Sequence, residues 1–114
     1  MSADQNARLA AMAHPAPFAD TDDGWMTAAG VRFFIDGRAQ ATLIVLGSTL
    51  HLGLERAENP TGRTAWILYV SDAVTWLDGP AAGQTISDTE SRAIEEISQR
   101  AIQEMGYVAI TVRD

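Results

Sequence analysis

The chain has 114 residues, of which 46% are hydrophobic and 20% are charged, a balance typical of one globular domain rather than of a disordered segment. It contains no cysteine, which excludes disulfide frameworks, thiolate metal sites and cysteine nucleophiles. The formal net charge of −7 argues against binding to nucleic acid or to an anionic membrane, since both carry phosphate; it is compatible with a basic protein partner, and equally with solubility alone.

The first 29 residues are predicted to form an N-terminal extension made of a short helix and a loop. Alanine, leucine, arginine and methionine favour a helix over residues 3–13, and Pro15 and Pro17 end it. Residues 20–24 are typical of a polar loop. No apolar run approaches the ~18 residues of a membrane span, and the N-terminus lacks the basic and apolar regions of a signal peptide. We therefore expect a cytoplasmic protein that binds no membrane.

Residues 30–114 are predicted to form a single α+β domain that begins with an antiparallel β-meander. Alternation of apolar and polar side chains predicts about five strands, and the second strand, which is apolar on both faces, is expected at the centre of the sheet. Residues 55–63 are predicted to be a polar loop. The expected strands span residues 31–35, 39–46, 50–54, 65–70 and 74–77.

Residues 88–105 are predicted to form one long C-terminal helix that packs on the sheet. Ser87 is its expected N-cap, and Glu90 completes the Ser-x-x-Glu pattern of a capping box. Apolar residues recur at steps of three and four and form one stripe for the core. Gly106 provides a C-terminal cap, and residues 108–112 alternate as a final strand. The apolar stripe consists of Ile94, Ile97, Ala101, Ile102 and Met105.

No combination of residues predicts a catalytic, metal or cofactor site. His14 and His51 are the only histidines, and neither has a set of ligand partners at suitable spacing. Asp20, Asp22 and Asp23 have the alternating oxygens of a calcium loop but lack the later glutamate ligand, so a solvated loop is the preferred interpretation. The sequence also lacks the glycine-rich and nucleophile motifs of common enzymes. We expect a protein that is not an enzyme and that binds no cofactor.

Each of two tryptophans in the β region can be either a core residue or an interface residue. Trp66 lies within an expected strand, and we interpret it as a core residue under the helix. Trp76 stands near a turn, two residues before Asp78. Tryptophan is enriched in interface hot spots and is also a common core filler, so both interpretations of Trp76 stay open.

A recognisable pattern runs through the second half of the chain. Tyr69 is followed by Val-Ser-Asp-Ala-Val-Thr-Trp, a short loop containing proline comes after Trp76, and residues 86–88, Ile-Ser-Asp, lead into a helix with an isoleucine stripe that ends at Gly106. This pattern resembles a bacterial family of polymorphic-toxin immunity proteins, the immunity protein 74 family. The resemblance implies a cytosolic protein that binds one cognate toxin and blocks it. Many such toxins are basic nucleases, which an acidic inhibitor would suit.

We interpret the chain as an immunity protein, including the type that acts in contact-dependent growth inhibition, that neutralises a basic toxin as a monomer. A secretion or assembly chaperone, which would need a dimer with an apolar groove, and a small ligand-binding domain, which would need a polar pocket, remain alternatives. Acidic loops at one end of the sheet, with an aromatic anchor, are predicted to contact the partner. The predicted partner-binding residues are Asp20, Asp22, Asp23, Glu55, Glu58, Asp72, Trp76 and Asp78.

Overall fold

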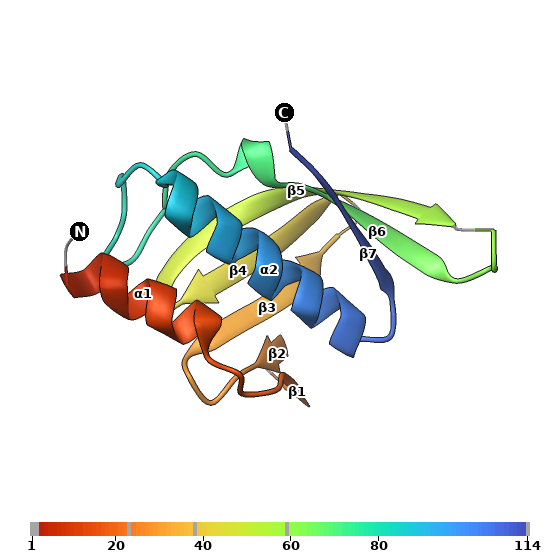
Figure 1. Cartoon of the computed structure of the whole chain (residues 1–114), viewed down its shortest axis with the longest axis horizontal. Coiled ribbons are helices and arrows are strands. Elements are labelled where there is room, and N and C mark those ends of the chain that lie inside the picture. The colour runs from red at the N-terminus through yellow and green to blue at the C-terminus, as the bar shows by residue number, and fades with distance from the viewer. Residues whose placement is uncertain (1–2, 23, 38, 59, 114) are drawn as a thin grey trace.

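The part of the chain that the structure describes folds into one seven-stranded sheet that carries two α-helices on one of its faces (Figure 1). The computed structural model describes residues 3–22, 24–37, 39–58 and 60–113, and of Asp72 only the backbone. In chain order the elements are the helix α1 (Ala3–Ala13), the strands β1 (Ala19–Thr21), β2 (Gly24–Met26), β3 (Val31–Asp36), β4 (Gln40–Val45), β5 (Ser48–Glu58) and β6 (Thr64–Tyr69), the 3-10 turn η1 (Val70–Asp72), the helix α2 (Asp88–Glu104) and the strand β7 (Val108–Val112).

The strands lie in the sheet in the same order as in the sequence. Each strand from β1 to β5 pairs antiparallel with the next, whereas β7 pairs parallel with β6, with Ala65 opposite Val108 and Tyr69 opposite Val112. A parallel neighbour requires a long crossover, and η1, a loop and α2 provide it. The predicted α+β class, with a meander, one long C-terminal helix and a final strand, is confirmed.

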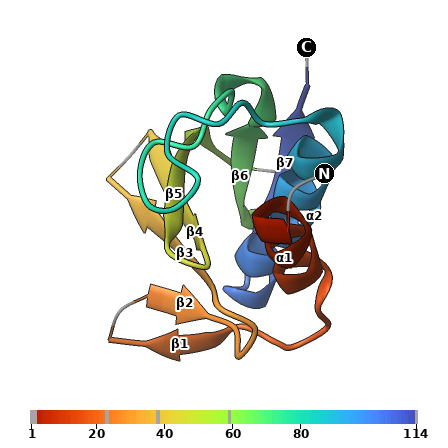
Figure 2. The ribbon, with the colours of Figure 1, turned by 90° about the vertical axis from the view of Figure 1, so that its left-hand side faces the viewer.

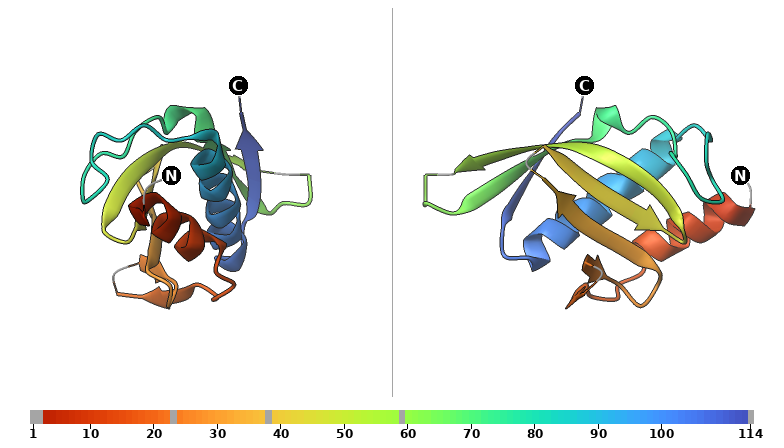
Figure 3. Two further views of the ribbon diagram at one scale, coloured as in Figure 1. Left: turned by 60° about the vertical axis from the view of Figure 1, so that its left-hand side comes forward. Right: turned by 180° about the vertical axis from the view of Figure 1, so that it is seen from behind.

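The hydrophobic core lies between the sheet and the helices. The strands curl around α2, so that the inner faces of β3, β4 and β5 point at its apolar stripe (Figure 3). Leu43 and Leu50 are directly opposite each other on β4 and β5, and both are fully buried together with Ile94 and Ile97 of α2. Burying one such side chain contributes roughly 1.5–3 kcal/mol, so this layer stabilises the packing of α2 on the sheet.

The helix α2 forms where the sequence predicts it. The hydroxyl of Ser87 accepts a hydrogen bond from the amide of Glu90 at 3.2 Å, which is the expected N-cap. At the other end Gly106 has a φ of +94°, and the amide of Tyr107 donates to the carbonyl of Ile102 at 3.2 Å. Glycine adopts this positive φ without the steric penalty that other residues have, and the conformation turns the chain back toward the sheet, where β7 begins.

The N-terminal residues contribute to the core and to the sheet, which the sequence did not predict. Met12 and Phe18 are 3% and 7% exposed and belong to the same core as the meander, and α1 lies alongside α2 (Figure 2). Glu104 of α2 accepts a hydrogen bond from the amide of Phe18 at 2.7 Å. The expected polar loop at residues 20–24 is wrong for the residues described there: Asp20 and Thr21 belong to β1, Gly24 begins β2, and Thr21 lies opposite Gly24 across the hairpin.

The segment between η1 and α2 is a loop, and the predicted strand at residues 74–77 is wrong. The loop runs beside the first residues of β5, where the amide of Leu77 donates to the carbonyl of Thr49 at 2.9 Å in an isolated bridge. Gly79 allows this approach, because a Cβ at that position would lie 2.1 Å from the carbonyl oxygen of Gly47. The loop is held by few sheet contacts, so its side chains follow tertiary packing rather than strand alternation.

The strand β5 is longer than predicted. The expected loop at residues 55–63 is wrong in its first part, because β5 continues to Glu58 and pairs with β6 as far as Thr64. Glu55, Arg56 and Glu58 are exposed along this ribbon, which projects beyond the helices in Figure 1. Charged side chains interrupt the apolar alternation that marks a strand in a sequence, and cross-strand pairing alone extends the strand there.

Candidate functional site

The acidic residues predicted to gather at one end of the sheet are dispersed. Asp78 forms a bridge with Thr49 near the beginning of β5, whereas Glu58 ends the same strand. Glu58 lies nine positions after Thr49 along this extended strand, which corresponds to about 30 Å. Asp20 and Asp22 belong to the β1–β2 hairpin at the opposite edge of the sheet from β7. The prediction of one acidic end is therefore wrong.

For two of the predicted partner-binding residues the structure describes no side chain. Asp23 lies outside the described residues, and Asp72 ends η1 with its side chain outside them. Glu55 is exposed and accepts a hydrogen bond from the hydroxyl of Tyr69 on the neighbouring strand. That bond ties Glu55 to the outer face of the ribbon, away from the β1–β2 hairpin.

The prediction that Trp76 is an aromatic anchor for a partner is corrected, because its side chain is 1% exposed. Its indole Nε1 donates to Glu90 Oε2 at 3.1 Å, and the guanidinium of Arg8 lies 5.1 Å from the centre of its ring. Of the two interpretations of Trp76, core residue and interface residue, the core residue is therefore the right one. The loop presents Val74 and Leu77 to solvent instead, at 62% and 54% exposure.

A buried polar network closes the N-terminal end of α2. Arg8 Nε donates to Glu90 Oε2 at 3.2 Å, and each of the two side chains is 2% exposed. Gln5 Nε2 donates to the other carboxylate oxygen at 2.9 Å, and Gln84 accepts from Arg8 at 3.3 Å. Both carboxylate oxygens of Glu90 therefore accept hydrogen bonds from α1 or from Trp76. No described hydrogen bond joins this carboxylate to the Ser87 amide, so the predicted capping box is wrong in its second half.

The imidazole of each histidine contacts neighbouring polar groups of the chain. His51 Nδ1 lies 3.2 Å from Gln40 Nε2 and 3.1 Å from Thr42 Oγ1 on the outer face of the sheet. The Nδ1 atom of His14 accepts from the amide of Ala16 at 3.1 Å, beyond the end of α1. Among the described residues, no three histidine, aspartate or glutamate side chains gather in the way a metal ion requires.

An open groove lies at the C-terminal end of α2, between that end and the β1–β2 hairpin, with a volume of about 430 Å³. Its walls are half-buried aromatic and aliphatic side chains, and its rim carries the exposed carboxylates of Asp20 and Asp22. No described residue donates a hydrogen bond to either carboxylate. We call this surface the acidic groove; its lining residues are Asp20, Thr21, Asp22, Gly24, Trp25, Phe34, Ile35, Met105 and Tyr107.

The acidic groove joins two of the predicted partner-binding residues to aromatic residues that sequence reasoning missed. Trp25 is half-buried on β2, and Tyr107 is 37% exposed directly after the glycine that ends α2. The ring of Tyr107 meets that of Trp66 edge to face, with centroids 6.2 Å apart, which fixes its position. The guanidinium of Arg32 lies 5.2 Å from the centre of the Phe34 ring, so this wall already receives one arginine from its own chain. The one sequence signal that could have indicated this groove is that Trp25 closely follows three aspartates.

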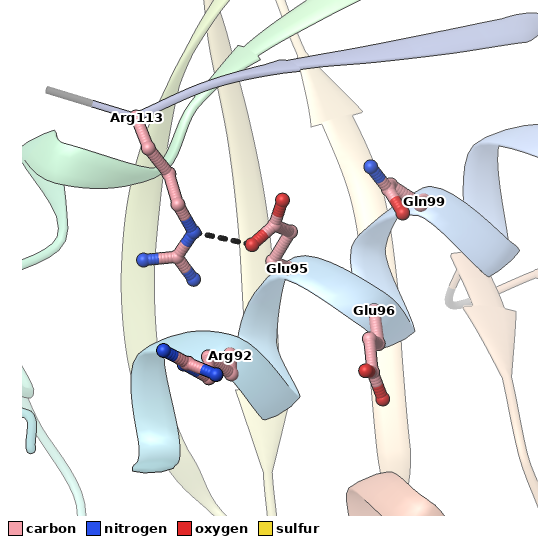
Figure 4. Close-up of a pocket in the computed structure, with 5 residues that line it drawn as sticks. All are labelled: Arg92, Glu95, Glu96, Gln99 and Arg113. Atoms are coloured by element: carbon pink, nitrogen blue, oxygen red, sulfur yellow. Dashed lines mark hydrogen bonds and ion pairs between the residues drawn. The ribbon is translucent and has the colours of Figure 1, made fainter. Parts of the chain in front are cut away.

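A second, shallower groove of about 390 Å³ runs between α2 and the end of β7. Arg113 forms an ion pair with Glu95 and also donates to the hydroxyl of Ser91 at 3.1 Å (Figure 4). Arg92 and Glu96 extend from α2 without an ion pair to any described residue. We call this surface the β7 groove; its lining residues are Arg92, Glu95, Glu96, Gln99 and Arg113.

Comparison with protein-family models, with characterised proteins and with solved structures finds no match for the chain. Neither helix in the described part of the chain combines the length and the apolar character needed to cross a bilayer. Of the surfaces of the molecule described above, the acidic groove has the most specific combination of shape and chemistry.

Proposed function

We propose that this chain is an inhibitor of the immunity-protein type that binds a basic protein toxin through the acidic groove. The observation that supports this proposal best is the composition of the groove, where two carboxylates border a wall of aromatic and methionine side chains and no lining residue is basic. Interfaces of this kind use aromatic residues and methionine for contact area and charges at the rim for steering.

The charge of the whole chain supports the same partner. A net charge of −7 attracts a cationic protein over a Debye length of about 8 Å at physiological ionic strength. Asp20 and Asp22 are exposed and have no described hydrogen-bond partner, so a partner's arginine or lysine can approach them without breaking a contact within the chain. The aromatic rings of Trp25 and Tyr107 are close enough to the same rim to receive the aliphatic part of such a side chain.

The groove alone is smaller than a stable interface. Specific protein complexes bury about 1,600 Å² in total, so the contact would extend from the groove onto neighbouring elements. The exposed part of the β1–β2 hairpin lies on one side of it and the C-terminal turn of α2 on the other. We expect the aromatic residues at the centre of this surface to carry most of the binding energy.

The experiment begins with the protein that co-purifies with the tagged chain from its host and is identified by mass spectrometry. That protein is then produced in bacteria alone and together with the chain. Growth arrest by the protein alone, relieved by the wild-type chain, is the expected result. A partner that is harmless when produced alone, or whose toxicity the chain does not relieve, would contradict the immunity function.

The binding site is tested by surface plasmon resonance with the same partner. Asp20→Asn/Asp22→Asn is expected to slow association roughly tenfold at low salt and less at high salt, because rim charges act mainly on the association rate. Glu58→Gln/Glu96→Gln changes the net charge by the same amount at exposed positions outside the groove and serves as the matched control. Equal effects of the two double variants would place the contact elsewhere.

A further inference from the structure

The strand β7 ends the sheet with an open edge. It pairs with β6 on one side, and no described backbone hydrogen bond joins it to another strand. In a parallel ladder, alternate residues of an edge strand point their N–H and C=O groups away from the neighbour. β7 therefore presents a row of backbone donors and acceptors that a further strand can satisfy.

This edge lacks two of the features by which proteins discourage pairing, a charge and a proline. Its sequence, Val-Ala-Ile-Thr-Val, contains no charge and no proline, and four of its five residues are β-branched. Ile110 is 43% exposed at the middle of the strand, on the face of the sheet opposite the helices. Val108 and Val112 share that face because side chains alternate along a strand.

The sequence of the edge is complementary to itself. An antiparallel copy centred on Ile110 places Ile110 opposite its own equivalent, Val108 opposite Val112 and Ala109 opposite Thr111. The three apolar side chains of each copy then form one continuous row on the outer face. Only the antiparallel arrangement has the two-fold symmetry that closed dimers use.

The charge around the edge also suits a second copy. Each chain carries −7, so two copies repel each other over most of their surfaces. The β7 groove is the exception, because its two arginines balance its two glutamates and the strand itself is uncharged (Figure 4). Two copies can therefore meet along β7 without bringing like charges together, which the acidic groove would not allow.

We propose that β7 pairs antiparallel with β7 of a second copy of this chain, about a two-fold axis at Ile110, so that one sheet continues through both copies. A pair of five-residue strands is a small contact, and contacts below about 1,200 Å² are typical of weak complexes. We expect a dissociation constant on the order of 10 µM, which would leave the chain monomeric when dilute. The dimer is independent of the proposed toxin and leaves the acidic groove unused.

Cysteine cross-linking tests the register directly, because the chain has no cysteine of its own. Residues directly opposite in an antiparallel pair have Cα atoms about 4.5–5.5 Å apart, which is within the range of a disulfide. Ile110→Cys is therefore expected to form a covalent dimer under mild oxidation. Val108→Cys alone is the matched control, because its two copies would be about 13 Å apart along the strands. A mixture of Val108→Cys and Val112→Cys chains is expected to cross-link.

Sedimentation of the full chain between about 1 and 500 µM provides the second test, over the range in which a dimer of this strength forms. Wild type is expected to shift from monomer to dimer, and Ile110→Lys to stay monomeric with an unchanged melting temperature. Leu77→Lys, at another exposed apolar position, should leave the dimer intact. A wild-type chain that stays monomeric at 500 µM, or Ile110→Cys and Val108→Cys chains that cross-link equally, would overturn the proposal.

Discussion

At the N-terminal end of α2, a tryptophan, an arginine and a carboxylate are buried against one another, whereas at its C-terminal end a tryptophan, a tyrosine and two carboxylates border an open groove. The carboxylate of Glu90 accepts three described hydrogen bonds, from Arg8, Gln5 and Trp76. The carboxylates of Asp20 and Asp22 accept none from described residues. Similar side chains thus stabilise the fold at one end and remain available at the other, and the difference lies in whether α1 and a loop cover them.

The largest expected effect comes from opening the buried end. Glu90→Ala leaves the guanidinium of Arg8 buried without its charge partner, so we expect a loss of about 3–5 kcal/mol in the free energy of unfolding. Urea denaturation measures it. Glu96→Ala removes the same group from an exposed position on the same helix, and a loss within about 0.5 kcal/mol is expected there.

A double replacement separates the pair from its surroundings. Arg8→Met/Glu90→Leu removes both charges and keeps most of the volume, so it should cost less than Glu90→Ala alone. If Glu90→Ala costs less than about 1 kcal/mol, the network is not the element that fixes α1 to α2.

The contrast between the two ends also shows what a single sequence can predict. The helix α2 was predictable because its signals are local: Ser87 precedes it, the apolar stripe repeats within it and Gly106 ends it. The buried network was not predictable, because the partners of Glu90 come from 82 and 85 residues earlier in the sequence and from a loop without periodicity. The sequence left Trp76 open as a core or an interface residue, and its burial against Glu90 and Arg8, which are distant in the sequence, decides for the core.

The acidic groove could be predicted only in part. Asp20 and Asp22 were recognised because acidic residues cluster in the sequence there. The aromatic wall brings Trp25 of β2 together with Tyr107 after α2, and nothing in the sequence shows that these residues meet. The hairpin itself has no apolar alternation, so it resembles a polar loop.

A smaller effect is expected from replacing tryptophan at each end. Trp76→Phe removes the indole donor to Glu90 and should cost about 1–2 kcal/mol, because a buried carboxylate loses one of its hydrogen bonds. Trp25→Phe, in the open groove, should cost less than about 0.5 kcal/mol and instead weaken binding of the partner. Thermal and urea unfolding of both variants compares them. A larger loss for Trp25→Phe would show that the groove is part of the core.

A loss of about 1 kcal/mol is expected for Ser87→Ala, because the amide of Glu90 loses its N-cap acceptor. Gln5 also donates to this hydroxyl, at 3.1 Å, so the substitution removes an acceptor from Gln5 as well. Ser87→Thr keeps the acceptor and is the control. An unchanged stability for Ser87→Ala would show that the helix does not depend on this cap.

The smallest effect on stability is expected from Asp20→Asn/Asp22→Asn. Both carboxylates are exposed and no described residue donates a hydrogen bond to them, so the melting temperature should stay within about 2 °C of wild type. Its direction is informative: the chain carries −7, and removing two neighbouring negative charges should raise the melting temperature slightly at low salt. Salt at about 0.5 M should abolish the rise, because screening removes the repulsion in wild type as well. Calorimetric melting curves at two salt concentrations measure the change. A fall of more than about 5 °C would mean that these carboxylates stabilise the hairpin, and they would then be structural residues rather than the free rim of a binding surface.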